Sequence, residues 1–249
     1  MTPAGSAAAR SVRIAAWNCC GGPLATKLAA AGRLRADILV LPEAPRMPDG
    51  PTAAWIGENP RRGLAVVVRP PWQVAQLDVG PVKLPRYFLP VRVTGPETFT
   101  LWGVWACAFG TDRYVRATHR ALDECQAHLR RHAPLLLGDF NSHSRWDHEH
   151  PPDRSHSALV GRLGALGYVS AFHHQRGRPH GREGHATFYE YRHRDKPYHL
   201  DYAFVPPHLV PRLRRVHLGQ HRTWSAWSDH MPLVLELAPA GGSAAEQEA

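Results

Sequence analysis

Hydrophobic residues gather in short runs along the chain, and most of these runs have the length and residue types of β-strands. The most regular run covers 135–138, and its last residue is the first of the sequence Gly-Asp-Phe-Asn. Further runs predict strands at 12–17, 37–43, 63–69, 88–93, 99–105, 186–191, 199–205, 209–218 and 233–237. The runs 88–93 and 99–105 are predicted to pair as an antiparallel hairpin, because a Gly-Pro turn sequence separates them.

Apolar residues recur at helical spacing in three other segments, which predict helices over 24–34, 114–131 and 157–166. We expect loops in the polar or proline-rich and glycine-rich segments 44–62, 70–86, 142–156 and 173–185. Many strands, few helices and no sustained βαβ alternation predict one α/β domain of packed sheets over 11–238. The small and polar ends, 1–10 and 239–249, are expected to be disordered.

The chain of 249 residues has a formal net charge of +9, and all but three of its 30 basic residues are arginine. This charge favours an anionic partner, with nucleic acid before an acidic membrane surface, although GC-rich genomes also produce arginine-rich proteins. Cys19 and Cys20 are adjacent, which strains a mutual disulfide, and the four cysteines contain no CxxC pair. With no signal-type or membrane-spanning run, we expect a cytoplasmic protein that does not associate with membranes.

Four acidic residues end or interrupt the predicted strands, and they are Glu43, Asp139, Asp201 and Asp229. Buried acids are costly unless they are paired or bind a metal, and oxygen ligands suit Mg²⁺, with Mn²⁺ as a substitute. Asp139 and Asn141 are two residues apart, so both point to one face of an extended chain. A carboxylate beside an amide can accept a proton from water and orient that water, but an Asx turn would use the same residues.

Histidine is concentrated late in the chain, where 14 of the 17 histidines lie between His143 and His230. They lack the paired Cys/His spacing of a zinc site, which disfavours zinc. His230 directly follows Asp229, and Asp201 could hold its ring and favour the cationic form. A metal, a water-activating carboxylate and a cationic donor together predict hydrolysis of a phosphoester.

Five motifs resemble, in order, those of the endonuclease/exonuclease/phosphatase superfamily. They span about 12–237 and read Trp17-Asn18, Leu41-Pro42-Glu43, Gly138-Asp139-Phe140-Asn141, His199-Leu200-Asp201-Tyr202 and Ser228-Asp229-His230-Met231-Pro232-Leu233. That superfamily includes pancreatic-type DNases, exonuclease III-type abasic endonucleases, sphingomyelinases and inositol phosphatases. The resemblance implies a four-layered α/β sandwich, in which two packed, mostly antiparallel β-sheets are flanked by helices and strand ends meet at the active site.

The resemblance also implies a role for each motif residue. The implied ligands of Mg²⁺ or of the phosphate are Glu43, Asp229 and Asn18. The implied catalytic residues, which activate and orient the water and stabilise pentacovalent phosphate, are Asp139, Asn141, His230, Asp201 and Asn18. Two positions depart from the family pattern. Trp105 stands about where members carry a His or Tyr, and Cys20 stands where members often carry an extra acid, which makes a second metal site less expected.

A nuclease that favours DNA over RNA and acts as a monomer is the first interpretation, because basic and aromatic residues lie on loops near the motifs. The expected substrate-binding residues are Trp105, Arg116, Trp146, Phe188, Arg192, Arg194, Lys196 and Tyr198. Phe188, Tyr198 and Leu200 resemble the slot that abasic endonucleases use for a baseless sugar, which implies DNA repair. The alternatives are a small-molecule or lipid-headgroup phosphodiesterase or phosphatase, and a nucleic-acid-binding module without catalysis.

Overall fold

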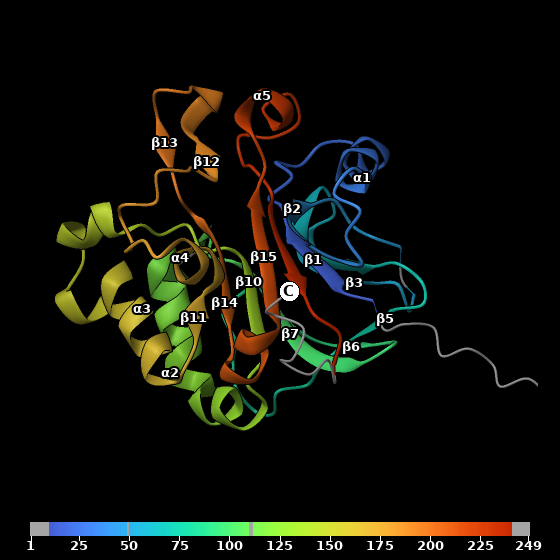
Figure 1. Ribbon diagram of the computed structural model, residues 1–249, viewed down its shortest axis with the longest axis horizontal. Helices are drawn as coiled ribbons and strands as arrows, with labels where there is room; N and C mark the ends of the chain where they lie inside the picture. Colours follow the sequence, from blue (N-terminus) through green and yellow to red (C-terminus); the bar gives the residue numbers. More distant parts are fainter. Residues whose placement is uncertain (1–9, 49, 110–111, 241–249) are drawn as a thin grey trace, which may run out of the picture.

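The structure is a computed structural model that describes residues 10–48, 50–109 and 112–240. Two six-stranded sheets pack face to face, and helices cover their outer faces (Figure 1). The first sheet has the order β15 (Leu213–Leu218), β16 (Leu233–Leu237), β1 (Val12–Ala16), β2 (Ile38–Ala44), β4 (Arg62–Val68) and β3 (Ala53–Asn59). The second has the order β11 (Val169–Ser170), β14 (Asp201–Val205), β10 (Leu135–Asp139), β7 (Thr98–Trp105), β6 (Phe88–Thr94) and β5 (Gln73–Gln76).

Alternate side chains of the central strands enter different buried layers, which explains why the layers form. In β10, Leu135 and Leu137 face the core between the sheets, whereas Leu136 faces outward onto the helical layer. In β1, Ile14 lies in the inter-sheet core and Ala15 packs against the opposite helical layer. Because neighbouring side chains of a strand point to opposite faces, a strand that is apolar throughout needs cover on both sides. The predicted four-layered sandwich is therefore confirmed.

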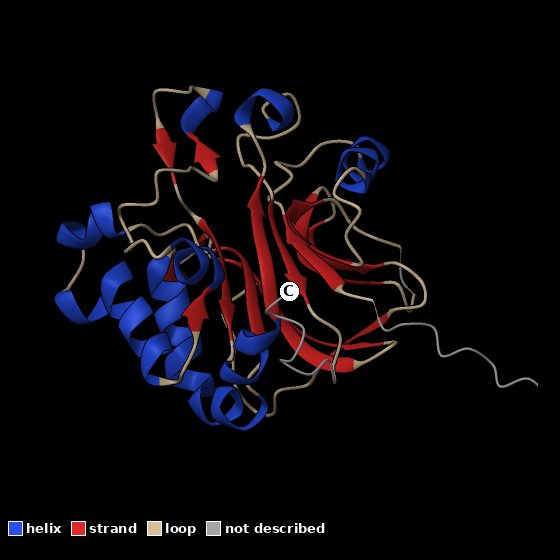
Figure 2. Cartoon of the chain, viewed as in Figure 1, coloured by secondary structure: helices blue, strands red, loops and turns tan. Residues whose placement is uncertain are grey.

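The helices and short elements complete the layers (Figure 2). The α-helices are α1 (Leu24–Gly32), α2 (Val115–His132), α3 (His156–Ala165), α4 (Ala171–Arg176) and α5 (His221–Trp224). The 3₁₀ helices are η1 (Ser144–Glu149), η2 (Pro152–Arg154), η3 (Glu190–Arg192) and η4 (Pro207–Arg212). Two small ribbons pair β8 (Ala108–Phe109) with β9 (Asp112–Arg113), and β12 (Phe188–Tyr189) with β13 (Pro197–Tyr198). In the described residues, no helix combines the length and apolarity needed to cross a membrane.

Each large sheet contains one parallel strand pair, and these pairs place the site. β1 runs parallel to β2, and β10 runs parallel to β7, while the other neighbouring strands are antiparallel. The carboxyl ends of two parallel neighbours lie at the same sheet edge. This arrangement brings the residues that follow β1 next to the end of β2, and Asp139 opposite Trp105.

Several sequence-based assignments were wrong. The expected loops 44–62 and 70–86 contain the strands β3 and β5, and the expected irregular segment 173–185 begins inside α4. The expected strand 209–218 starts as η4 and becomes extended at Leu213. The expected strand 186–191 is extended only at Phe188–Tyr189 and continues as η3. The predicted disorder of 1–10 and 239–249 falls mostly on 1–9 and 241–249, which lie outside the described residues. The described Arg10 pairs with Asp37.

A substitution at Gly138 tests how closely the backbones of β10 and β7 approach each other. Its φ is 148°, and a Cβ at this position would lie 2.0 Å from the carbonyl oxygen of Val104. We expect Gly138→Ala to lower the free energy of unfolding by about 3 kcal/mol in urea denaturation, because backbone atoms cannot move aside. Gly161→Ala is the matched control, since a Cβ there meets no atom within 4 Å and alanine favours the α3 helix. Equal stability of the two variants would contradict the close strand contact.

Candidate active site

Residues from both sheets converge where β1, β2, β10 and β14 end or begin. Asn18 follows β1, Glu43 lies in β2, Asp139 ends β10 and Asp201 begins β14. His230 lies between α5 and β16, and its backbone makes an isolated bridge with Phe188. The predicted catalytic residues Asp139, Asn141, Asp201, His230 and Asn18 therefore come together.

Asp139 is the centre of this arrangement, and its side chain is fully buried. Its Oδ2 accepts hydrogen bonds from the amide groups of Asn18 and Asn141, each at 2.9 Å. Its Oδ1 accepts the backbone N–H of Asn141 at 2.9 Å, which is the local Asx-type contact that the sequence allowed. The Asx-type turn is therefore part of the site. The side-chain amides of Asn18 and Asn141 hold the Asp139 carboxylate in one orientation.

His230 lies between two carboxylates. Its Nδ1 donates to Asp201 Oδ2 at 2.8 Å, and its Nε2 lies 3.9 Å from Asp139 Oδ2. Asp201 is itself positioned because Thr187 Oγ1 accepts its backbone N–H at 2.9 Å. The imidazole is therefore oriented with Nε2 toward Asp139. The sequence had predicted Asp201 as the partner of this ring, but not the position of Asp139.

Burial and charge set the protonation of this group. Burial raises the pKa of Asp139 to about 7, and the carboxylate of Asp201 adds to this while His230 opposes it. Burial lowers the pKa of His230, but the carboxylates of Asp201 and Asp139 outweigh burial and raise it to about 10. At neutral pH, His230 is a cationic donor, and Asp139 can exchange a proton near its own pKa.

The segment 228–230 is fixed to the end of β1. Ser228 Oγ donates to the backbone oxygen of Asn18 at 2.7 Å and accepts the backbone N–H of His230 at 2.9 Å. The indole N–H of Trp17 donates to the backbone oxygen of His230 at 3.1 Å. These bonds place the last motif of the chain against the first.

Glu43 reaches the site through an irregularity in β2. The register of β2 with β4 shifts between Pro42 and Ala44, and Glu43 has a φ of 59°. Such bulges re-aim a side chain. The Glu43 carboxylate accepts a hydrogen bond from Asn18 Nδ2 at 3.1 Å and pairs with the exposed guanidinium of Arg62 at 2.5 Å.

This geometry matches a known family. A family model described as the Endonuclease/Exonuclease/phosphatase family matches residues 15–230. The chain belongs to this family. No curated protein matches the sequence. Members of the family are hydrolytic phosphoesterases that generally depend on a divalent metal, so the chain is a phosphoesterase, as the motifs implied.

Solved structures share the fold at low sequence identity. A 3′–5′ exonuclease from Neisseria meningitidis (NExo) is 20% identical, with a TM-score of 0.67 over 91% of this chain and 100% of the other. An AP endonuclease from Archaeoglobus fulgidus is 18% identical, with a TM-score of 0.65 over 91% and 99%. The endonuclease domain of the telomere-specific non-LTR retrotransposon TRAS1 is 18% identical, with a TM-score of 0.63 over 92% and 99%. At these identities the likeness establishes the fold.

The oxygen donors of this family member fit a divalent cation. The half-buried Glu43 and Asp229 both act electrostatically on Cys20, which raises the pKa of that thiol beyond the effect of burial. The guanidinium beside Glu43 shows that the carboxylate accommodates a positive charge. Asn18 is different, because its Oδ1 already accepts the N–H of Cys20 at 3.0 Å and its Nδ2 donates to the carboxylates of Glu43 and Asp139. These bonds favour Asn18 as a positioning residue.

Trp105 occupies the position where the family pattern differs. Its ring is only 7% exposed, and it packs on Tyr87 with ring centroids 4.5 Å apart. The guanidinium of Arg62 lies 5.5 Å from the Trp105 ring centroid. Trp105 therefore supports the arginine that pairs with Glu43, and it offers little surface to a ligand.

The other predicted substrate-binding residues lie in different parts of the structure around the candidate active site. The ring of Phe188 lies 4.7 Å from that of His230. Trp146 stacks on Tyr198 at 5.0 Å, and Arg145 lies over Tyr198 at 5.3 Å. The exposed loop of the β12–β13 hairpin carries Arg192, Arg194 and Lys196, and Lys196 pairs with Glu190 at 3.4 Å. Arg116 is exposed on α2.

Two cavities adjoin these residues. The larger, of about 900 Å³, is bordered by five arginines, which are Arg145, Arg176, Arg182, Arg194 and Arg222. The smaller, of about 290 Å³, lies beside Asn141 and is bordered by Tyr114, Trp146 and His156. His143 borders both, so the two cavities are neighbours.

Some functional neighbours were not predicted. The sequence around Arg62 did not mark it as a site residue, because it is one arginine among many and ends the expected loop 44–62. Thr187 and Ser228 contribute through hydroxyl bonds to residues distant in sequence. The Ser-Asp-His motif contained Ser228, but the bond to Asn18 depends on the fold.

Asp201 is expected to set the protonation of His230 in the metal-free protein. We expect the His230 imidazole to stay protonated at mildly alkaline pH in the unmodified protein, because a carboxylate neighbour raises its pKa. In Asp201→Asn the pKa should fall toward the ordinary histidine value. Nitrogen-15 NMR titration of the imidazole measures the shift, with Asp195→Asn in the exposed hairpin loop as the control. An unchanged pKa in Asp201→Asn would contradict this assignment.

Proposed function

We propose that the protein is a Mg²⁺-dependent phosphodiesterase that hydrolyses DNA, as an endonuclease or a 3′-exonuclease. The observation that carries the proposal is the set of Asp139, His230 and Asp201, in which His230 bonds Asp201 and lies 3.9 Å from Asp139. The arginine-bordered cavity reaches the β12–β13 hairpin, whose Phe188 contacts the His230 ring. Nucleic acid supplies both the scissile phosphodiester and the extended negative charge that such a surface attracts. One structural neighbour is a 3′ phosphatase from Neisseria (NExo) bound to a product DNA hairpin, which supports DNA as the substrate class.

The residues divide the proposed reaction between them. Asp139 accepts a proton from the attacking water, because its carboxylate is buried and its pKa lies close to neutral. Asn141 and Asn18 hold the carboxylate in place through their amide groups. His230 donates from Nε2 to a phosphoryl oxygen as negative charge develops, and Asp201 keeps that ring cationic and oriented.

Glu43 and Asp229 would hold the divalent cation. When bound, the cation would stabilise negative charge on the phosphoryl and leaving oxygens. Half-buried carboxylates that still reach solvent suit Mg²⁺, which keeps several of its waters and also binds substrate phosphate. Mn²⁺ prefers the same oxygen ligands and would substitute.

The aromatic residues favour action at a distorted or baseless nucleotide. Phe188 contacts the His230 ring, Tyr198 pairs with Phe188 across β12 and β13, and Leu200 is buried just beyond. Together they form an apolar wall next to the catalytic imidazole. A sugar without its base would fit such a wall better than an intact nucleotide, so we infer a preference for abasic DNA and a role in repair.

A small phosphodiester is the second candidate substrate. The 290 Å³ cavity beside Asn141 could accept one nucleotide or a small head group rather than a strand. This alternative uses the same catalytic residues but predicts no dependence on the arginines of the larger cavity.

Catalysis is tested on labelled duplex DNA, intact or with one abasic site, in Mg²⁺ and in EDTA. We expect Mg²⁺-dependent cleavage that is faster at the abasic site. Asp139→Asn and His230→Ala should each reduce the rate about 100-fold or more, because each removes a proton-transfer or charge-stabilising group. The exposed His174→Ala is the control and should cleave as the unmodified protein does.

The outcomes separate the candidates. Hydrolysis of bis(p-nitrophenyl) phosphate without cleavage of any DNA would favour the small-substrate alternative. Cleavage that survives Asp139→Asn would reject the proposed base. Salt-sensitive DNA binding with no hydrolysis of either substrate would favour a nucleic-acid-binding module without catalysis.

The arginine-bordered cavity is tested by the salt dependence of DNA binding. Replacing Arg194 and Arg222 by alanine should weaken binding and flatten the plot of log affinity against log salt by about 1 to 2, because each phosphate contact releases counterions. Arg215→Ala removes an exposed arginine that does not border this cavity, and it should leave the slope unchanged. Fluorescence anisotropy with catalytically inactive Asp139→Asn protein measures both.

A further inference from the structure

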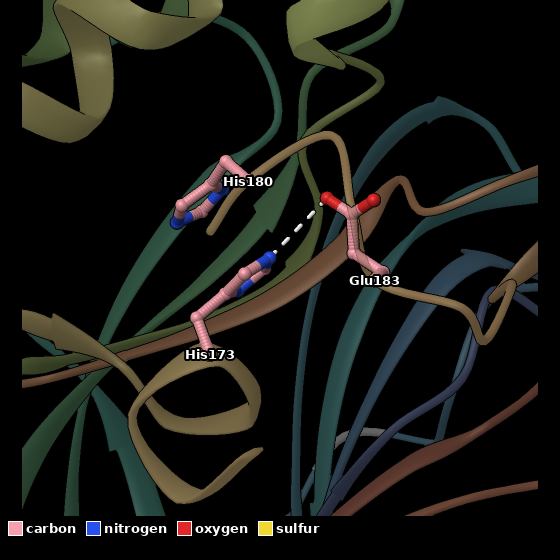
Figure 3. Close-up of side chains that lie close together, drawn as sticks. All are labelled: His173, His180 and Glu183. Carbon is pink, nitrogen blue, oxygen red and sulfur yellow. Dashed lines mark hydrogen bonds and ion pairs between the residues drawn. The ribbon is translucent and has the colours of Figure 1, made fainter. Parts of the chain in front are cut away.

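A second group of chemically active side chains lies outside the catalytic set, around the turn that follows α4. His173 comes from α4, and His180 and Glu183 come from the segment 177–187 that follows it (Figure 3). One possible ligand atom from each lies within 4.8 Å of those of the other two. The rings of His173 and His180 are parallel, with centroids 3.5 Å apart.

Glu183 places a buried carboxylate at this point. Its Oε1 accepts the backbone N–H of Gly181 at 2.6 Å and lies 3.2 Å from Nε2 of His173 (Figure 3). Its Oε2 lies 3.6 Å from Nε2 of His143. These contacts hold the pKa of Glu183 well below its usual range despite burial, so the carboxylate is ionised. A buried negative charge surrounded by imidazoles is a site that a cation stabilises.

The far nitrogens of these imidazoles are anchored. His173 Nδ1 bonds Ser170 Oγ at 2.8 Å, and His180 Nδ1 bonds His156 Nε2 at 3.0 Å. His156 in turn bonds Ser142 Oγ at 2.9 Å. Metal-binding histidines characteristically use their second nitrogen in this way, which fixes the ring and its tautomer.

His199 provides an independent sign of a missing ligand. Its ring is 1% exposed and lies with its centroid 5.4 Å from that of His173. Its Nδ1 lies 3.1 Å from the backbone oxygen of His185, so Nδ1 carries the hydrogen and Nε2 carries a lone pair. In the described structure Nε2 is buried without a hydrogen-bond partner.

From this geometry we propose that His173, His180 and Glu183 bind one Zn²⁺ ion. Two imidazoles and one carboxylate suit Zn²⁺, whereas the oxygen ligands of the catalytic centre suit Mg²⁺. The sequence disfavoured zinc because the spacing of these histidines matches no zinc motif. The fold nevertheless brings them together.

The proposed ion would fix the position of the loop 177–187. Segment 177–187 connects α4 to the β12–β13 hairpin, and Arg182 and Gly184 in it border the arginine-lined cavity. One ion shared by α4 and this segment would fasten the loop to the second sheet. Zn²⁺ would then stabilise the wall of the cavity without entering the reaction.

The test uses Zn²⁺ alone on the full chain, after removal of metals with a chelator. We expect isothermal titration and elemental analysis to give one tightly held Zn²⁺ per chain, and a melting temperature that rises with free Zn²⁺. X-ray absorption at the zinc edge should show at least two imidazole ligands. An unmodified protein that holds no Zn²⁺, or a first shell of oxygen alone, would overturn the proposal.

Variants locate the ion. His173→Ala and Glu183→Gln should lose the tight site, and Ser170→Ala should bind about 10-fold more weakly because it frees the His173 ring. His174→Ala, one residue along α4 but exposed, should bind as the unmodified protein does. His230→Ala removes the imidazole of the catalytic centre and should retain the Zn²⁺. Circular dichroism confirms that each variant is folded, and loss of Zn²⁺ in His230→Ala with retention in His173→Ala would overturn the assignment.

Discussion

The burial of the Asp139 carboxylate is the constraint on which the rest of the site depends. A fully buried acid must be hydrogen-bonded or neutralised, and here two amides, one backbone N–H and a nearby imidazolium do both. The charged groups next to Asp139 also need stabilising contacts. Asp201 lies directly opposite Asp139 across β10 and β14, so two acids would repel each other if His230 were not between them.

Much of this arrangement was predictable from sequence, because the strands that carry it are buried on both faces. The runs before Asp139 and Glu43 are apolar throughout, and the acid at the end of each is conspicuous for that reason. The strands β3 and β5 escaped prediction because both are sheet edges with mixed, partly exposed residues. An edge strand buries less apolar surface, so its pattern is weaker.

Contacts between distant segments were not predictable for a different reason. Arg62 reaches Glu43 only because β2 and β4 are neighbours and a bulge turns Glu43 outward. The imidazoles around Glu183 come from α4, from the segment after it and from the residues that precede η1 and β14. No spacing rule describes such a set, since its geometry exists only after the second sheet and its helices have packed.

The pairing of β1 has a consequence for the order in which the protein can become active. The first strand lies between β2 and β16, and Val12 pairs with Leu237 near the other end of the described chain. During synthesis β1 emerges long before its partner β16, and the segment that carries His230 emerges just ahead of β16. The proposed catalytic residues cannot come together on a chain that is only partly made. A growing polypeptide of this kind would therefore carry no hydrolytic activity beside the messenger RNA from which it is translated.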